Sequence, residues 1–280
     1  MAGGIPALHP ATIAPLPDLR AYLDVASAAD FTVADFNMVD ALALEDAEGT
    51  EAVVEAFGSR RVRAGGWGSG VRIFADDATF DEGLRHLPRA AALASALGAR
   101  AAGVVVPNRS EEAPERALVH FAARIARLAD VLAPHEVEAS LEFIGARVWP
   151  ELPHRLPDDV GGMLKLADRA GRSNVGVLFD TYHFHCGSSR LADIGAAAGR
   201  INLVHLNDAP PGDPSNLDDS VRRLPGDGVI DLGAVIDALE AAGYSGSGGV
   251  EVFSDELLAL PALDAARRVA AATRAVLGLP

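Results

Sequence analysis

The sequence contains a single cysteine, Cys186, among 280 residues, so no disulfide can form within the chain. Aromatic residues make up only 5%, so the 49% of hydrophobic residues are mainly aliphatic or small. No segment approaches the roughly 18 consecutive apolar residues that a membrane-spanning helix needs. The start, MAGGIPALHPATIAPLPDL, also lacks the basic and then apolar pattern of a secretory signal. We therefore expect a cytoplasmic protein without disulfides.

Basic residues are in the minority as well, because 24 Lys and Arg face 39 Asp and Glu, a formal charge of −15. Such a surface repels the phosphate backbone of nucleic acids and the headgroups of anionic lipids. We expect a small molecule as the partner, and neither nucleic acid nor membrane. Oligomerisation is common among proteins of the fold predicted below, but no sequence feature sets the oligomeric state.

Short apolar runs alternate with longer Ala-, Leu- and Arg-rich segments of helical period along the whole chain. The runs predict eight strands, at Ala11–Pro15, Phe31–Asn37, Arg61–Gly66, Ala101–Pro107, Glu138–Ile144, Val175–Asp180, Ile201–Asn207 and Gly249–Phe253. This rhythm is typical of parallel strands joined by crossover helices, and eight such units close into a barrel. We predict a single-domain (β/α)8 TIM barrel over residues 1–280. A doubly wound sheet is the alternative, but no Gly-rich phosphate fingerprint follows the first strand.

Four of the later predicted strands carry a potential metal ligand near their carboxyl end, where barrels place their functional groups. These residues are Glu142, Asp180, His205 and Glu251. Their apolar neighbours alternate with them, which turns all four side chains into the barrel. Singly, each has an ordinary explanation as a buried ion pair, a core histidine or a helix cap. Together, three carboxylates and one imidazole in one place require a cation.

Three oxygen donors and one imidazole favour a hard divalent ion over the thiolate-rich sites of structural zinc. The sequence therefore predicts one divalent metal ion, with Mn²⁺ first and Mg²⁺, Co²⁺ or Zn²⁺ as alternatives. Zinc stays among them because affinity rises along the metal series towards it.

Several segments of the second half resemble the xylose isomerase-like superfamily of sugar isomerases and epimerases, nearest to its inosose isomerase branch of inositol catabolism. They are SLEFIG (140–145), NVGVLFDTYHFH (174–185), VHLND (204–208), RRLPGDGVIDL (222–232) and GVEVF (249–253). The resemblance is close from about residue 138 to 253 and only architectural before that. It implies that Glu142, Asp180, His205 and Glu251 bind the metal and that His183 and Arg222 contact the substrate.

The chemistry of these residues fits proton transfer next to the carbonyl of a sugar or cyclitol, through an enediolate. A metal polarises the carbonyl, and Glu142 and Glu251 are the candidates for removing and returning the proton, in either order. His183 would donate a hydrogen bond to the developing oxyanion, and Arg222 would supply positive charge. Arg222 also has a simpler interpretation, as a solvated loop cation beside Asp218 and Asp219.

Three rival functions share this scaffold. A lyase would use the same ligands for elimination, as a dehydratase of keto-cyclitols or dehydroshikimate or as a deglycosidase of 3-keto-glycosides. A DNA-repair endonuclease would need more histidine ligands, for several metal ions, and a basic face for the DNA backbone, whereas this chain has eight histidines in total and a formal charge of −15. A catalytically silent barrel would only bind a sugar or a partner, but it would not need both inward glutamates.

The segment from Asp208 to Asp227 is polar, rich in Pro and Gly and long for a connection in a compact domain, so it is predicted to be a lid or site loop. Asp208 is interpreted either as an orienting partner of His205 or as a turn cap. Trp67 and Trp149 lie near predicted strand ends and either wall the substrate pocket or pack in the core.

Overall fold

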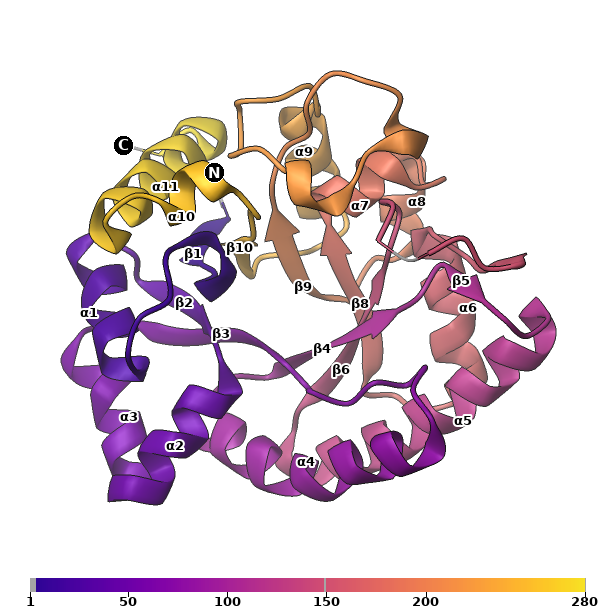
Figure 1. The fold of residues 1–280 in the computed structure, drawn as a ribbon, viewed down its shortest axis with the longest axis horizontal. Helices are drawn as coiled ribbons and strands as arrows, with labels where there is room; N and C mark the ends of the chain where they lie inside the picture. Colours follow the sequence, from indigo (N-terminus) through magenta and orange to yellow (C-terminus); the bar gives the residue numbers. More distant parts are fainter. Residues whose placement is uncertain (1–3, 149, 280) are drawn as a thin grey trace.

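A computed structural model describes residues 4–148 and 150–279. Its parallel strands close into a barrel in the order β1-β10-β9-β8-β6-β4-β3-β2, surrounded by helices (Figure 1). The barrel strands are β1 (Ile5–Leu8), β2 (Val33–Phe36), β3 (Arg63–Gly68), β4 (Ala101–Val106), β6 (Glu138–Phe143), β8 (Val175–Asp180), β9 (Ile201–Leu206) and β10 (Ser247–Val250). This topology confirms the predicted (β/α)8 TIM barrel.

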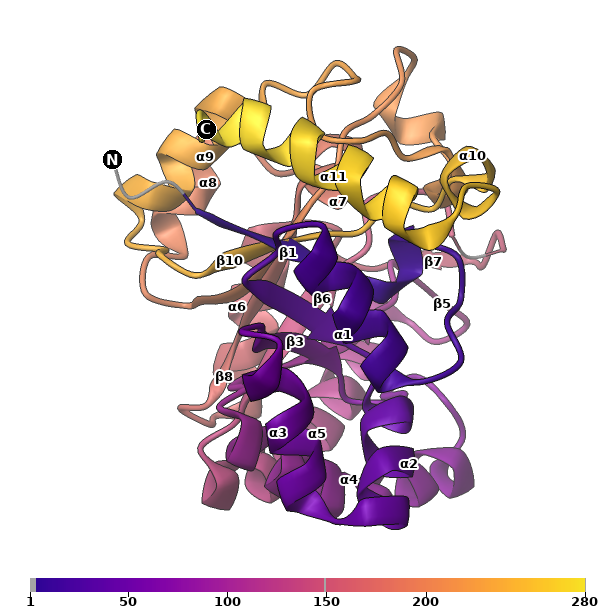
Figure 2. The ribbon, with the colours of Figure 1, turned by 90° about the vertical axis from the view of Figure 1, so that its left-hand side faces the viewer.

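Helices connect successive strands and cover the outside of the barrel. The α-helices are α1 (Leu19–Ala28), α2 (Met38–Glu48), α3 (Thr50–Ser59), α4 (Asp77–Leu97), α5 (Pro114–Leu132), α6 (Val160–Ala170), α7 (Thr181–Cys186), α8 (Leu191–Ala196), α9 (Leu232–Ala241), α10 (Asp255–Leu258) and α11 (Ala262–Leu277). Short 3-10 helices occupy Pro10–Thr12, Ala133–His135, Pro214–Asn216 and Asp219–Val221, and β5 (Arg109–Ser110) pairs with β7 (His154–Arg155) outside the barrel. The last helix, α11, packs against α1 and β1 and so ties the two ends of the chain together (Figure 2).

The predicted first strand is wrong. Strand β1 spans Ile5–Leu8, whereas Pro10–Thr12, inside and beside the predicted range Ala11–Pro15, forms a 3-10 helix. Proline pre-sets a turn-compatible backbone angle and lacks an N–H for a strand ladder, and the ring of His9 accepts the N–H of Ala11. The four residues of β1 become a strand because β10 and β2 pair with them on both sides, which local sequence does not reveal.

The remaining predicted strands exist: Val175–Asp180 has the same bounds as β8, and the others have shifted ends. The last strand ends at Val250, so Glu251 follows it directly instead of lying inside it. Outward side chains of the strands pack against the helices, and the Phe143 and Phe179 rings meet edge to face at 6.2 Å between centroids. Inside the barrel, a small apolar cluster of Ala101, Leu178 and Leu203 fills the space.

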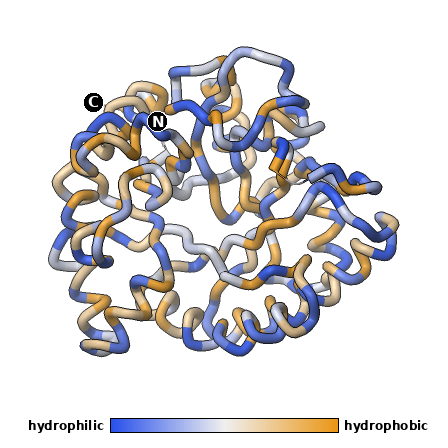
Figure 3. Tube along the Cα trace, viewed as in Figure 1, coloured by the Kyte–Doolittle hydropathy of each residue, from blue (hydrophilic) through white to orange (hydrophobic). Residues whose placement is uncertain are grey.

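Hydrophobic and hydrophilic positions alternate along the outer helices, and the loop after β9 is mostly hydrophilic (Figure 3). In the described part of the chain, no helix combines the length and apolar character that crossing a membrane would require. The alternation is that of helices packed by one face on the barrel and solvated on the other.

Asp208 organises the predicted site loop. Its two carboxylate oxygens accept the backbone N–H groups of Ala209, Gly226, Gly228 and Ile230 at 2.8 to 3.0 Å. A Cβ built on Gly228 would overlap this carboxylate, so glycine is required there. Asp208 and Arg223 also exchange backbone hydrogen bonds at 2.9 and 2.8 Å. The loop is thereby folded back on β9, and its residue 222 is held above the barrel mouth.

Candidate metal centre and active site

All four predicted ligands meet at the carboxyl end of the barrel. Each of Glu142, Asp180, His205 and Glu251 offers one ligand atom, and these atoms lie within 4.8 Å of one another. They come from β6, β8, β9 and the residue after β10. Four neighbouring strands of a closed barrel converge at this point, which is why residues more than a hundred positions apart share one cluster.

Asp180 serves two local purposes. Its Oδ1 accepts the N–H groups of Tyr182 and His183 at 2.8 and 2.9 Å and so caps α7, while its Oδ2 accepts from the Asn207 side chain at 2.8 Å. The capping interpretation and the position in the cluster therefore both hold. With no exposed surface, this carboxylate is held by hydrogen bonds to its charged form.

Arg222 is buried in the cluster. Its Nη1 donates to Asp180 Oδ2 and to Glu251 Oε2, both at 2.9 Å. Its Nη2 donates to Asp219 Oδ1 at 2.8 Å and faces Nε2 of His183 at 3.1 Å. The interpretation of Arg222 as a solvated loop cation is therefore wrong, although the neighbouring Asp219 does pair with it. The folding of the loop on Asp208 brings this guanidinium inward.

His183 accepts from Arg222 in this arrangement, because a guanidinium can only donate. Burial lowers the pKa of His183, which favours the neutral ring. Its Nε2 also lies 4.0 Å from Glu142 Oε1, so the imidazole stands between the guanidinium and the glutamate. His183 and Arg222 are thus both at the cluster, as the family resemblance implies.

The two glutamates differ in their surroundings. Glu251 contacts Arg222 and has Nδ1 of His205 at 3.3 Å and Nε2 of His9 at 3.6 Å; against the opposing effect of burial, these neighbours hold its pKa well below the usual range. No hydrogen bond to the side chain of Glu142 is found within the described residues, and burial next to Glu251 raises its pKa to about 8. Glu142 is thus the more readily protonated of the pair.

His205 fits a metal-ligand role on its own contacts. Its Nδ1 is buried and makes no hydrogen bond within residues 4–148 and 150–279. Burial alone would lower its pKa, but the carboxylates of Glu251 and Asp35 raise that pKa to about 10. The raised pKa means that the surrounding carboxylates stabilise positive charge at this ring. A divalent ion bound by three carboxylates and one imidazole would supply that positive charge in place of the proton. The residues present therefore fit a divalent cation.

The stability of the metal-free protein should fall as pH rises from neutral to about 10. The folded-state pKa values of Glu142, about 8, and His205, about 10, both exceed their ordinary values. The stabilisation from these protons is complete below the ordinary values and is lost as pH passes through the raised ones. Thermal unfolding at a series of pH values measures this slope. With a saturating divalent ion, the slope should flatten because the ion replaces the protons; an identical slope with and without the ion would contradict the prediction.

Replacing Arg222 by methionine should destabilise the metal-free protein by about 3 kcal/mol or more, because the substitution leaves buried carboxylates without their cation. A saturating divalent ion should restore part of this loss, since it supplies the missing positive charge. Denaturant unfolding with and without the ion measures both effects. The matched control is Arg223→Met, because its side chain is exposed next to the site; an equal loss in both variants would refute the assignment of Arg222 to the cluster.

Two cavities adjoin the cluster. The larger, of about 520 Å³, is lined by Glu142, His183, Arg222 and Glu251 and walled by apolar side chains that include Phe253. Its volume lies in the roughly 300–1,000 Å³ range of small-molecule sites. The smaller, of about 180 Å³, shares both glutamates and reaches toward the ends of β1, β2 and β3. Glu142, His205 and Glu251 therefore face space in which a small polar molecule fits, whereas Asp180 lies beneath it with no exposed surface.

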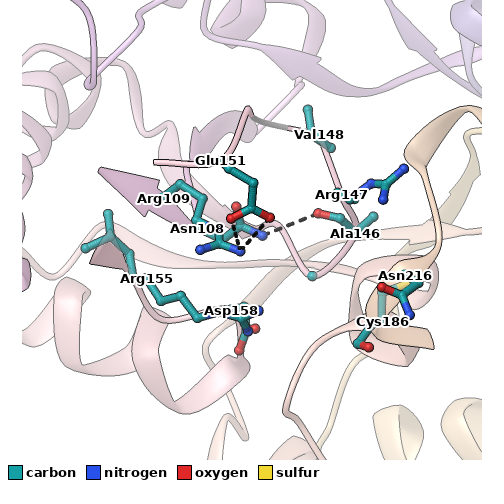
Figure 4. A pocket seen from close by; sticks show the side chains of 13 residues that line it. Asn108, Arg109, Ala146, Arg147, Val148, Glu151, Arg155, Asp158, Cys186 and Asn216 are labelled. Atoms are coloured by element: carbon teal, nitrogen blue, oxygen red, sulfur yellow. Dashed lines mark hydrogen bonds and ion pairs between the residues drawn. The ribbon is translucent and has the colours of Figure 1, made fainter. Parts of the chain in front are cut away.

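A third cavity, of about 170 Å³, lies beyond the segment 145–148 and contains none of the four ligands. Figure 4 shows Arg109 paired with Glu151 and Asn108 donating to the carbonyl of Ala146, at 3.3 Å in both cases. Cys186 lines this cavity and has no part in the cluster. Trp67 lines the 180 Å³ cavity, with its buried Nε1 unpartnered in the part of the chain described. Trp149 lies outside the described residues.

Sequence reasoning missed several residues of the site. Among them, His9 was hidden by the misplaced first strand, whereas Asp35 follows the rule that found the glutamates, since it alternates with Ala34 and Phe36 in β2. Asn207 directly follows β9, and its contact with Asp180 depends on the pairing of β8 with β9. Parity alone would have identified Asp35; the other two needed the fold.

Comparison with known proteins gives a consistent picture. A family model described as xylose isomerase-like TIM barrel matches residues 23–276. An inosose isomerase of Halalkalibacterium halodurans is 31% identical over 142 residues, which cover 50% of this chain and 48% of that protein. An L-ribulose 3-epimerase of Mesorhizobium japonicum is 29% identical over 192 residues, covering 66% and 58%. The matched part of the chain thus spans about half the length of these relatives.

A solved structure of the IOLI protein with a bound zinc atom superimposes with a TM-score of 0.84 at 21% identity, over 97% of each chain. At this identity, the match shows the common fold.

Proposed function

The chain belongs to the xylose isomerase-like TIM barrel family, and from this premise we propose that it is a divalent-metal-dependent isomerase or epimerase of a sugar or cyclitol. An inosose or a related ketose is the proposed substrate, and residues 1–280 act as one catalytic domain. The observation that carries the proposal is the convergence of four ligand atoms, three carboxylate oxygens and one imidazole nitrogen, within 4.8 Å of one another. Names of relatives support the substrate class.

Glu142, Asp180, His205 and Glu251 would hold the ion, which when bound supplies a Lewis acid that polarises the substrate carbonyl. Manganese is the first choice for this oxygen-rich donor set. Zinc is the alternative, since a structural neighbour binds it.

Glu142 is the proposed base. Its carboxylate is buried and lines both cavities. Burial beside Glu251 raises its pKa to about 8 in the metal-free protein, and with a divalent ion bound the group is the carboxylate that a general base requires. It removes the proton from the carbon next to the carbonyl, and the electron pair moves onto the carbonyl oxygen to give an enediolate. The same carboxyl group, or Glu251 from another side of the cavity, returns a proton to complete the exchange.

Arg222 and His183 act on the oxygen side of the substrate. The guanidinium donates in a fixed planar fork and provides positive charge where the oxyanion develops. In the substrate-free arrangement, its Nη2 faces Nε2 of His183, so the two side chains form one polar wall of the larger cavity. Burial excludes bulk water from this wall and strengthens its electrostatic effect.

The test is proton exchange between substrate and solvent. The Mn²⁺-loaded chain is incubated in deuterium oxide with a panel of inososes and ketoses, and nuclear magnetic resonance follows the loss of C–H signals and the appearance of isomers. Exchange of the C–H for C–D without loss of water from the substrate is expected. Loss of water from the substrate would show a lyase instead, and binding without exchange for every substrate would show a silent barrel; either result overturns the proposal.

A further inference from the structure

A further carboxylate lies inside the barrel behind His205. Asp35, on β2, is 2% exposed, and its Oδ1 accepts the backbone N–H of Gly66 at 2.6 Å. Its Oδ2 is buried without a hydrogen-bond partner within residues 4–148 and 150–279. This oxygen lies 3.9 Å from Nε2 of His205. A buried, half-satisfied carboxylate is costly, so its retention calls for a physical reason.

The surrounding strands leave room for this side chain. A Cβ built on Gly65 would overlap Oδ1 of Asp35, and a Cβ built on Gly249 would overlap Oδ2. Gly249 is the register partner of His205 on the adjacent strand, so the missing side chain opens a path from the carboxylate to the imidazole. Glycine inside a strand weakens it, yet two glycines on two strands, β3 and β10, accommodate this one carboxylate.

The two nitrogens of His205 face different carboxylates. Its Nδ1 lies 3.3 Å from Oε2 of Glu251, on the side of the ligand cluster, and its Nε2 is the atom turned to Asp35. A neutral imidazole that binds a metal through one nitrogen carries its hydrogen on the other, and a carboxylate facing that hydrogen fixes the tautomer and the ring orientation. The Asp35 carboxylate, the His205 imidazole and the ion site thus follow one another, with the imidazole in the middle.

We propose that Asp35 is a positioning residue for His205, holding the imidazole with its hydrogen on Nε2 and Nδ1 free to bind the divalent ion. The inference rests on the metal site of the proposed function. It adds a residue that lies outside the ligand set and acts through His205 alone.

A second ion is the competing explanation, because His9, Asp35 and His205 also offer ligand atoms within 4.8 Å of one another. The hydrogen bonds disfavour it. His9 Nδ1 accepts the N–H of Ala11 at 3.3 Å, so the neutral ring carries its hydrogen on Nε2, the nitrogen that faces Glu251 at 3.6 Å. His205 would in addition have to bridge two ions through both nitrogens, which requires an imidazolate.

The first test is metal affinity, measured by calorimetric titration of the full chain with Mn²⁺. Asp35→Asn keeps the shape of the side chain and should weaken binding about tenfold or more, the usual effect of removing such a partner. Gly65→Ala should weaken binding in the same direction, because the atoms nearest to its new Cβ belong to Asp35 and Ala34, so the Asp35 carboxylate is displaced and not the His205 ring. The control is Gly248→Ala, whose Cβ would press on the side chain of Leu206 and not on Asp35; it should leave affinity unchanged.

The second test reads the tautomer directly. In the Zn²⁺-loaded chain labelled with ¹⁵N-histidine, Nε2 of His205 should carry the hydrogen in the wild type, and Asp35→Asn should shift that signal. Unchanged affinity and tautomer in Asp35→Asn would overturn this inference alone, as would two ions bound per wild-type chain. A wild-type chain that binds no ion would overturn the proposed function as well.

Discussion

Glu142→Gln should lower kcat by about a thousandfold or more while the fold stays intact, because general acid–base catalysis contributes roughly 10²–10⁴ and a ligand charge is lost with it. Glutamine preserves the size of the side chain, which lines both cavities of the site. The amide cannot accept the substrate proton as a carboxylate does. Turnover and solvent exchange of the substrate C–H, measured side by side, report the effect.

The matched control for this variant is Glu138→Gln. Glu138 begins the same strand, β6, and is half-buried, but it lies four residues before Glu142, at the other end of the strand, and lines neither of the two cavities. Activity of this control should equal that of the wild type. Wild-type exchange in Glu142→Gln would remove Glu142 from the role of base. An equal loss of activity in both variants would point to a general disturbance of the strand.

Removal of the metal should lower kcat by about a hundredfold or more, because a Lewis acid contributes several kcal/mol to stabilising the transition state. Dialysis against a chelator and reconstitution with Mn²⁺, Co²⁺, Mg²⁺ or Zn²⁺ compare the ions by restored activity. The ion should also raise the melting temperature, since a ligand at one hundred times its Kd stabilises the folded state by about 2.7 kcal/mol.

The variant His205→Gln removes one of the four proposed metal ligands and tests the same metal dependence. It should neither regain activity nor gain thermal stability when Mn²⁺ is added, because the only imidazole of the four-ligand cluster is gone. His120→Gln is its control, since His120 is exposed on α5 and lines neither cavity next to the cluster. Full activity of the chelated wild type would contradict the metal dependence, and with it the assignment of the four residues as ligands.

Sequence alone determined the fold class and the cluster. Alternation of apolar runs with helical segments is a local property, so it predicted the barrel, and the two-residue period of strands placed Glu142, Asp180 and His205 inside. Glu251 was found by the same rule, although its strand ends one residue earlier, at Val250. Periodicity survives small errors in strand ends because a side chain keeps its face.

Only the tertiary structure decided which distant groups touch these residues. The first strand depends on pairing with β10 and β2, and no local signal contains that pairing. Arg222 enters the cluster because the Asp208 carboxylate accepts hydrogen bonds from several backbone N–H groups of the loop and so holds the loop against the barrel. Asp35 reaches His205 through space left by two glycines on other strands. Closure of the barrel creates the hydrogen bonds and close contacts between segments that are far apart in the chain. The inward or outward direction of a strand residue, by contrast, follows from the apolar or polar character of its neighbours in sequence.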